Sequence, residues 1–481
     1  MDEEDGILHL VTPENLLLAA FIAVLALAPF PYGATRPWAE VGLGLGVGGI
    51  LFAWSGLVLT GLATVAQPIR RVLMPALCIA AGLGWAVIQS VDLQAVKDLT
   101  GIDLRMLAHP VWSVTSKALG GDAGSYISVD PETTRHAVFA SAISVGAFLV
   151  AFELARDGAR ARVLLGSIVI IACAYAAAAL TSQYLPFDAQ ALVVPDPLPP
   201  SERLARPFAS ANHFATFTTL GAIAGMGLFV ETLRQSVVWD KGVRTTLRTA
   251  GGTLGGAGGL WLIATAGVMT ALLAAQSRSG VIAFLIGTIA LIIALAAGRS
   301  WSTNEESGRR AMTAILVAAL GIAAAVSIDA LTGRVPEVGP SDAVRASLSE
   351  SSMQAIGAAP FVGHGFGAFE RYYPLFADGA VASQADEANN DLLETLADLG
   401  LPAGLAFIAA PMLLAGMCFA GCLRRRRDRV YPAIGFAVSV AVAVHALVEF
   451  SLQIPAIAVT YATLLGLGVA QSWRTSMDAV R

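Results

Sequence analysis

Three arginines, Arg206, Arg278 and Arg345, lie beside or between long apolar segments of the chain. The charge pattern described below places all three on the outer side of a membrane, where basic residues are normally depleted. A guanidinium binds phosphate oxygens through two parallel N–H donors. The three arginines therefore predict capture of a phosphate or diphosphate group. The alternative is that each extends to lipid phosphates, but three of them flanking the large outer segments favour a binding site.

Carboxylates gather on the same side. Asp386, Glu387, Asp391 and Glu394 form one group, and Glu449 lies at the end of an apolar segment. An ionisable group at membrane depth is a functional candidate, whereas exposed loop carboxylates are more often only solvated. Glu449 follows His445 by four residues, so on one helix the two side chains would share a face and could pair.

The sequence motifs do not indicate a metal site or a nucleotide-binding site. The four cysteines lie inside apolar runs without a Cys-x-x-Cys spacing, which indicates small buried hydrophobic side chains. The glycine turn at 363–367 has no preceding strand, so it is not a dinucleotide fingerprint. Neither Gly-Lys-Ser nor Gly-Lys-Thr occurs, which excludes a P-loop ATPase. We expect no metal and no cofactor.

The elements that position these residues must be membrane helices. Of the 481 residues 56% are hydrophobic and 14% charged, against about 25% charged in soluble domains. This charge content is too low for the surface of a soluble enzyme, and it is also too low for a disordered chain. The net charge of −5 argues against binding nucleic acid. A bilayer needs about 20 apolar residues per helix. Twelve segments qualify, at roughly 16–31, 39–60, 72–91, 134–154, 163–183, 212–232, 255–275, 280–298, 311–329, 401–421, 431–448 and 454–472.

The basic residues set the orientation. With a cytoplasmic N-terminus, the cytoplasmic loops and tail hold 19 of the 30 lysines and arginines, including the run Arg424 to Arg427. We therefore predict a multi-pass protein of a bacterial inner membrane with both termini in the cytoplasm. The outer side then carries the long segments 92–133, 184–211 and 330–400. The acidic start of the chain does not resemble a cleaved signal peptide.

The largest outer segment shows helical signals. Ser341 and Asp342 can cap a helix that carries Leu348 and Ile356 on one side. A second, amphipathic helix is expected from about Glu387 to Leu399, ending at Gly400 and leading directly into the next span. The predicted fold class is an all-α membrane protein of about twelve transmembrane helices with a large extracytoplasmic loop containing short helices.

Five stretches, in order over roughly 200–460, resemble the O-antigen ligase and polysaccharide polymerase family. Arg206-Pro-Phe-Ala-Ser-Ala-Asn212-His213-Phe214-Ala215 is similar to its Asn-x-Asn-His-Phe-Ala signature, and Ser277-Arg278-Ser279-Gly280 to its Ser-Arg-Gly-Gly turn. Pro360 through Phe369 resembles Pro-Leu-x-Gly-x-Gly-x-Gly-x-Phe. Asn390-Asp391 through Gly400 resembles its Asn-Asp-Tyr-Leu stretch. His445 through Ala456 resembles His-Ser-Leu-Val-Asp-Phe-x-Leu-x-Ile-Pro-Ala. Residues 29–38 also fit the family.

The resemblance implies a GT-C-like glycosyltransferase that moves a glycan from undecaprenyl diphosphate onto lipid A core or onto another lipid-linked glycan. It implies a metal-independent, inverting displacement at the outer face of the inner membrane. Arg206 and Arg278 would hold the diphosphate, with Arg345 a weaker candidate. Asn212, His213, Asn390 and Glu449 would contribute to the substrate site.

The chain departs from the family pattern at the general base. Family members usually carry histidine one or three positions before the Asn-Asp pair, where this chain has Asn389 and Glu387. Glu387, or His364 if its loop folds back, is the candidate catalytic base. The alternatives are a catalytically inactive polysaccharide-assembly partner, or a transporter or flippase; against the latter stand the missing half-length repeat and the scarcity of polar residues in the spans.

The predicted organisation has three parts: N-terminal helices at 1–200, an O-antigen ligase-like membrane domain at 201–472, and a cytoplasmic tail at 473–481. Expected partners are the lipid-linked donor, the acceptor glycan, membrane lipids and a chain-length regulator, but not nucleic acid. Ligase and polymerase share these motifs; without a lipopolysaccharide-specific sign, we favour the polymerase.

Overall fold

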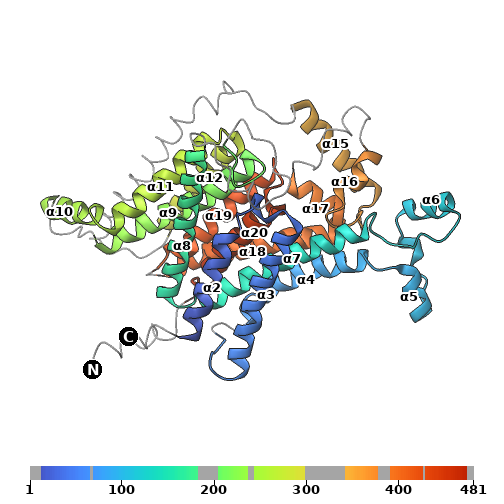
Figure 1. Cartoon of the computed structure of the whole chain (residues 1–481), viewed down its shortest axis with the longest axis horizontal. Helices are drawn as coiled ribbons and strands as arrows, with labels where there is room; N and C mark the ends of the chain where they lie inside the picture. Colours follow the sequence, from blue (N-terminus) through green and yellow to red (C-terminus); the bar gives the residue numbers. More distant parts are fainter. Residues whose placement is uncertain are drawn as a thin grey trace.

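The computed structural model describes residues 12–65, 69–182, 204–236, 243–297, 342–376, 390–425 and 428–473, and this part of the chain is helical throughout (Figure 1). The elements, in chain order, are α2 (Pro13–Leu27), η1 (Tyr32–Ala34), α3 (Pro37–Leu59), η2 (Ile69–Arg71), α4 (Leu73–Gln89), α5 (Leu93–Thr100), η3 (Arg105–Leu107), α6 (Pro110–Leu119), α7 (Pro131–Leu154), α8 (Gly158–Ser182), α9 (Ala211–Ser236), α10 (Val243–Leu254), α11 (Ala257–Ala274), α12 (Arg278–Ala297), α15 (Asp342–Ala358), α16 (Phe369–Tyr372), η5 (Tyr373–Leu375), α17 (Asp391–Leu399), α18 (Leu401–Arg424), α19 (Val430–Ala446), η6 (Ser451–Gln453) and α20 (Pro455–Ala470).

The all-helical membrane class is confirmed, but the count of twelve spans is not. Seven helices, α3, α7, α8, α9, α11, α12 and α18, are long and apolar enough to cross a bilayer, and α4 with α5 forms an eighth candidate bent by 90°. The helices α2, α19 and α20 match predicted segments but have at most 17 residues, below the roughly 20 of a perpendicular span. The predicted segment 311–329 lies outside the described residues.

Helix α9 is the centre of the bundle. Its apolar window is 100% buried, whereas that of α3 is only 17% buried. Glycines bring the neighbouring helices close: a Cβ atom on Gly221, Gly225 or Gly227 would lie within 2.4 Å of side chains of α8, α11 and α19. Without water to drive apolar contact inside a bilayer, such small residues permit the close packing that holds helices together. Helix α9 is thereby fixed among its neighbours α8, α11, α12 and α19.

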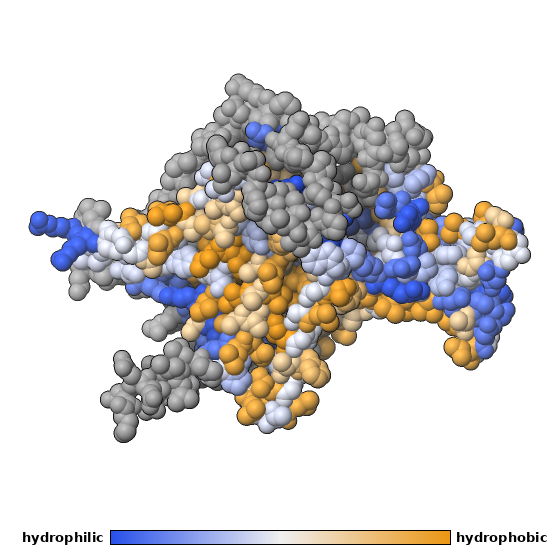
Figure 2. All heavy atoms as spheres, in the orientation of Figure 1, coloured by the Kyte–Doolittle hydropathy of each residue, from blue (hydrophilic) through white to orange (hydrophobic). Residues whose placement is uncertain are grey.

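Apolar side chains cover much of the visible face over α2, α3, α8 and α11 (Figure 2). Hydrophilic residues gather near the tips of the molecule at α10 and α5, which lie at opposite ends of its long axis (Figures 1 and 2). This distribution is the one expected of a bundle surrounded by lipid.

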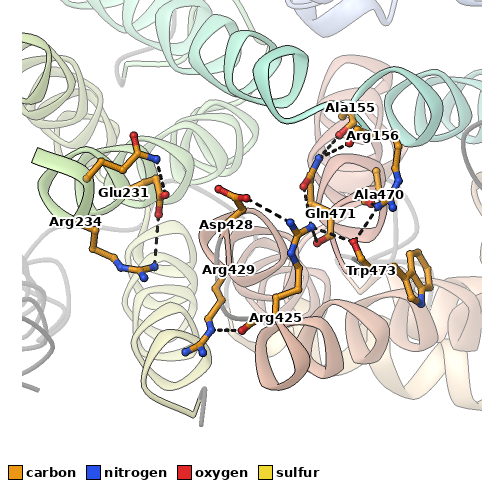
Figure 3. Close-up of polar contacts among 11 residues, drawn as sticks. Ala155, Arg156, Glu231, Arg234, Arg425, Asp428, Arg429, Ala470, Gln471 and Trp473 are labelled. Atoms are coloured by element: carbon orange, nitrogen blue, oxygen red, sulfur yellow. Dashed lines mark hydrogen bonds and ion pairs between the residues drawn. The ribbon is translucent and has the colours of Figure 1, made fainter. Parts of the chain in front are cut away.

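One end of the bundle is rich in arginine, and we call it the basic end (Figure 3). Gln471 donates to the carbonyls of Ala155 and Arg156 at 2.6 and 2.9 Å, where α7 stops. Arg425 donates to the side-chain oxygen of Gln471 at 2.9 Å and to the carbonyl of Trp473 at 3.2 Å. These donors satisfy helix carbonyls that have no partner within their own helix.

The two chain ends lie together at this basic end, as far as the structure describes them. Glu14, at the start of α2, is 3.7 Å from Arg160, and the Arg71 guanidinium lies 5.3 Å from the ring centre of Trp473, just after α20. The start of α2 and the end of α20 therefore lie at the same end of the bundle. That this end faces the cytoplasm remains a prediction.

The opposite end, which we call the site end, holds the described parts of the segments predicted to lie outside. It comprises η1, α5, α6, the start of α9, the start of α12, α15 to α17 and η6. Long-range bonds join them: the Val129 amide donates to the His364 carbonyl at 2.8 Å. Segment 92–133 holds α5 and α6, two helices that the sequence did not predict, and segment 330–400 holds α15, α16 and α17.

Candidate functional site

Arg206 lies in the turn that leads into α9, and the turn is held by the buried ring of Phe208. That ring contacts Phe214 and Phe217 of α9, with centroids 6.4 and 5.4 Å apart. The Arg206 guanidinium lies beside the ring of Tyr32 in η1, 5.3 Å from its centre. Packing of Phe208 thus fixes where Arg206 presents its charge.

Arg278 is the first residue of α12 and follows a turn at Gln276, whose φ is 52°. Gly280 packs so tightly on α9 that a Cβ there would lie 2.6 Å from that of Ala215. The Gly280 carbonyl also accepts from Thr219 at 3.4 Å. The structure therefore brings the segments bearing Arg206 and Arg278 to the same first turns of α9.

Asn212 and Glu449 form a direct contact at this place. The Asn212 amide donates to the carboxylate of Glu449, which is buried. His445 has other partners: its Nδ1 lies 3.1 Å from both the Thr216 and the Ser451 hydroxyls. Helix α19 ends at Ala446, between His445 and Glu449, and the pairing of these two side chains stays a prediction.

His213 is 4% exposed, and neither ring nitrogen has a hydrogen-bond partner among the described residues. Its ring meets that of Phe450 edge to face at 4.7 Å. Leaving buried polar atoms without a partner costs about 1–3 kcal/mol, so such a group calls for an explanation. A polar substrate bound at the start of α9 would provide hydrogen-bond partners for these ring nitrogens.

Helix α17 presents three buried carboxylates, Asp391, Glu394 and Asp398. Glu394 accepts from the Gln453 side chain at 2.8 Å, and Asp391 accepts from the Leu452 amide at 3.3 Å. Burial, reinforced by the charge of Glu394, holds the pKa of both Asp391 and Asp398 well above the ordinary aspartate value. The helix is thereby docked onto η6, next to Glu449.

The glycine turn at 363–367 packs on the end of α17. Gly363, Gly365 and Gly367 have φ of 70°, 115° and 74°, and a Cβ on Gly363 would lie 2.1 Å from the Asp398 carbonyl. Asp398 accepts from the Gly367 amide at 2.6 Å and from Tyr372 at 2.8 Å. These glycines allow the backbone of the turn to pack closely on the backbone at the end of α17; they do not form a nucleotide-binding loop.

His364 is buried inside this turn with both ring nitrogens engaged. Its Nε2 lies 2.9 Å from the Ala355 carbonyl, and its Nδ1 lies 3.2 Å from Nε2 of His109. Since a carbonyl can only accept, Nε2 of His364 carries the proton and Nδ1 accepts from His109. His109 Nδ1 in turn accepts from the Val111 amide at 3.3 Å. Both histidines are therefore neutral donors and acceptors in one chain of bonds.

The remaining predicted residues are placed as follows. Asn390 caps α17, its side-chain oxygen accepting from the Leu392 and Leu393 amides at 3.1 Å. Arg345 belongs to α15, but its side chain is not among the described ones. Glu387 lies outside the described residues. Sequence reasoning missed Tyr32, Arg36 and His109; only the family resemblance of residues 29–38 signalled the first two.

The cysteines behave as small apolar residues: Cys418 and Cys422 are buried and unbridged. Among the described residues, no three His, Cys, Asp or Glu side chains come together in a way that could hold a metal ion.

Comparison with known families adds to this geometry. Residues 261–408 match the family model described as O-antigen ligase. The chain carries an O-antigen ligase family domain. Arg278, the glycine turn and α17 lie within the matched residues, Arg206 and Asn212 precede them, and Glu449 follows. No curated protein matches the chain. The O-antigen ligase family implies a glycosyl-transfer enzyme that acts on lipid-linked glycans.

Proposed function

We propose that this protein transfers a glycan from undecaprenyl diphosphate to an acceptor glycan at the outer face of the inner membrane. The observation that carries the proposal is the placement of Arg206 and Arg278. Both lie on segments packed against the first turns of α9, at the site end of the bundle. Guanidinium groups there would neutralise the diphosphate, which makes it a better leaving group without a metal.

The proposed reaction is a displacement at the anomeric carbon of the donor glycan. The acceptor hydroxyl attacks the anomeric carbon from the face opposite the diphosphate, so the carbon–oxygen bond to undecaprenyl diphosphate breaks and the configuration inverts. The hydroxyl proton passes to a general base, for which Glu387 is the first candidate and His364 the second. Polar groups of the substrates would bind to Asn212, to Glu449 and to His213, whose ring nitrogens have no hydrogen-bond partner in the described part of the chain.

Between the two outcomes of such a transfer, we favour polymerisation onto another lipid-linked glycan over ligation to lipid A core. The large segment 330–400 carries no sign specific to lipopolysaccharide. A chain-length regulator would then be a partner in the membrane.

Substitution of the arginines tests the proposal in cells. Arg206→Ala and Arg278→Ala should each abolish or strongly reduce glycan transfer at normal protein levels. Lysine at either position should restore only part, because a point charge cannot reproduce the two-point fork. Arg105→Ala is the matched control, since Arg105 is exposed at the same end and paired with Asp103 at 2.7 Å. Wild-type glycan profiles in both alanine variants would refute diphosphate capture by these residues.

One observation favours a second candidate, an assembly partner that binds the lipid-linked glycan without transferring it. Asn389 stands at a family histidine position, and both nitrogens of His364 are engaged in structural bonds. Tight binding of donor by the purified protein, with no release of undecaprenyl diphosphate when acceptor is added, would identify this function.

A further inference from the structure

Just before α3 the chain makes a turn in an unusual backbone conformation. Tyr32, Gly33 and Ala34 have φ of 51°, 74° and 60°, and Tyr32 and Ala34 are each 1% exposed. A non-glycine residue in the left-handed region costs about 1–3 kcal/mol, and such residues cluster at functional sites. This turn lies outside the O-antigen ligase family match.

The turn is locked against the segment that carries Arg206. A Cβ on Gly33 would lie 2.7 Å from a ring carbon of Phe208 and 2.6 Å from a methyl of Ile454. Phe208 is the same residue that anchors Arg206 to α9. The position of Tyr32 and that of Arg206 are therefore set by one packed contact between segments far apart in the sequence.

Two cations meet at the ring of Tyr32. The guanidinium carbon of Arg36 lies 5.5 Å from the ring centre, and that of Arg206 lies 5.3 Å from it. Each cation is attracted by the aromatic ring, but the two also repel each other. Both arginine side chains are only partly buried, so they remain accessible at the site end of the bundle. An anion beside the ring would gain from both charges at once.

We propose that Arg36 is a further residue of the diphosphate site, acting with Arg206, and that Tyr32 is a positioning residue that sets the two guanidinium groups. The ligand is a diphosphate borne on a lipid, so the inference rests on the proposed function. A diphosphate has two phosphoryl groups, and Arg36 with Arg206 would hold one of them while Arg278 reaches the other. The N-terminal helices thus contribute directly to substrate binding.

Direct binding tests this inference separately from catalysis. The purified full chain is placed in nanodiscs of neutral phosphatidylcholine, and the affinity for undecaprenyl diphosphate is measured. Arg36→Ala should weaken binding by about 10-fold or more, the scale of one charge-assisted hydrogen bond, and Arg36→Lys should recover part of it. Tyr32→Phe keeps the ring and should bind nearly as wild type, whereas Tyr32→Leu should weaken binding. Arg105→Ala should bind normally, and thermal unfolding of each variant checks its fold.

Three results would overturn the inference. The first is normal diphosphate binding by a folded Arg36→Ala variant when Arg206→Ala has lost it, which leaves the proposed function intact. The second is an equal loss of phosphatidylglycerol and diphosphate binding in Arg36→Ala, which would make Arg36 a lipid-headgroup anchor. The third is equal binding by Tyr32→Leu and wild type, which removes the positioning role. If the wild type itself fails to bind diphosphate, the proposed function falls first.

Discussion

His109 and His364 form a chain of bonds that explains why one predicted residue is poorly suited to its expected role. A general base needs a free lone pair within reach of the acceptor hydroxyl. In His364 one nitrogen donates to the Ala355 carbonyl and the other accepts from His109. Burial also lowers the pKa of His364, so the residue holds the glycine turn to α6 more readily than it takes a proton.

The first residue prediction concerns the base. Proton removal in the transition state contributes about 10²- to 10⁴-fold to such reactions, so Glu387→Gln should lose most transfer activity. Glu387→His should retain some, because it restores a base at a position where the family has one. His364→Ala should have the smaller effect. Initial rates of undecaprenyl diphosphate release by the three variants decide the order, and the reverse ranking would move the base to His364.

The second prediction concerns pH. Burial and the neighbouring His364 lower the pKa of His109 to about 4. Between pH 6.5 and about 4, His109 is therefore protonated in the unfolded chain but neutral in the folded chain. The free energy of unfolding falls as the pH drops through this range. The protection factors of the α6 amides, which correct for the slower intrinsic exchange at low pH, should fall over this range, and less so in His109→Asn.

The comparison of variants isolates the histidine pair, because the raised pKa values of Asp391 and Asp398 act in the opposite direction but equally in both proteins. His136→Gln, on exposed α7 surface, is the matched control. An identical pH response in wild type and His109→Asn would refute the assignment.

Residue types predicted the candidates, but not their partners. Residue types mark Arg206, Arg278 and Glu449, and the family resemblance adds Asn212; the structure brings the segments that carry them to the start of α9. The sequence could not show that Tyr32 lies between Arg36 and Arg206, since η1 and the α9 turn are separated in the chain by the six helices α3 to α8. Likewise the His109–His364 contact depends on how α6 folds back.

At the scale of elements, the site is assembled from helix ends. Helix α17 runs directly into α18 through Gly400, whose φ is 76°, and this junction was predicted from the Gly-Leu-Pro sequence. The amphipathic pattern also predicted α17, although it begins at Asp391 within the described residues and not at Glu387. Helices α5 and α6 were missed because their short, mixed sequences lack a long apolar period.

A buried glutamine ties the end of α4 to the glycine turn. Gln89 donates to the carbonyls of Val362 and Asp398 at 2.7 and 2.8 Å and accepts from the Phe366 amide at 3.1 Å. Gln89→Leu would leave three backbone groups without these partners. We expect it to lower the free energy of unfolding by on the order of 2 kcal/mol or more, seen as a lower melting temperature in detergent.

Gln94→Leu provides the control, since Gln94 makes an exposed bond to Asp98 at 2.9 Å and should change stability little. Equal melting temperatures for Gln89→Leu and wild type would show that the glycine turn is held by its other contacts.

At the scale of the whole molecule, the two ends of the bundle carry different sets of polar residues. Arginines that cap helix carbonyls lie at the basic end, and the candidate site lies at the opposite end. The alternation of charge along the sequence predicted this division. The number of full spans could not be predicted in the same way, because hydropathy does not give the length of each helix: the predicted segments 431–448 and 454–472 become α19 and α20, which have only 17 and 16 residues.

Cysteine labelling tests the orientation. In a cysteine-free background, a Ser383→Cys variant should react with a membrane-impermeant maleimide added from outside the cell, because residues 330–400 are predicted to lie there. A cysteine placed in the Arg424–Arg427 run should be protected until the membrane is opened. The opposite pattern would invert the molecule and move the site to the cytoplasm.

Reconstitution tests whether this protein transfers a glycan from a lipid diphosphate. Purified wild-type protein in liposomes receives an undecaprenyl-diphosphate-linked glycan and a lipid-linked acceptor, with release of undecaprenyl diphosphate and growth of the acceptor glycan measured together. We expect one diphosphate to be released for each glycan added, and near-complete loss of both signals in Arg206→Ala and Arg278→Ala. Wild-type protein that binds the donor but yields neither signal would contradict it.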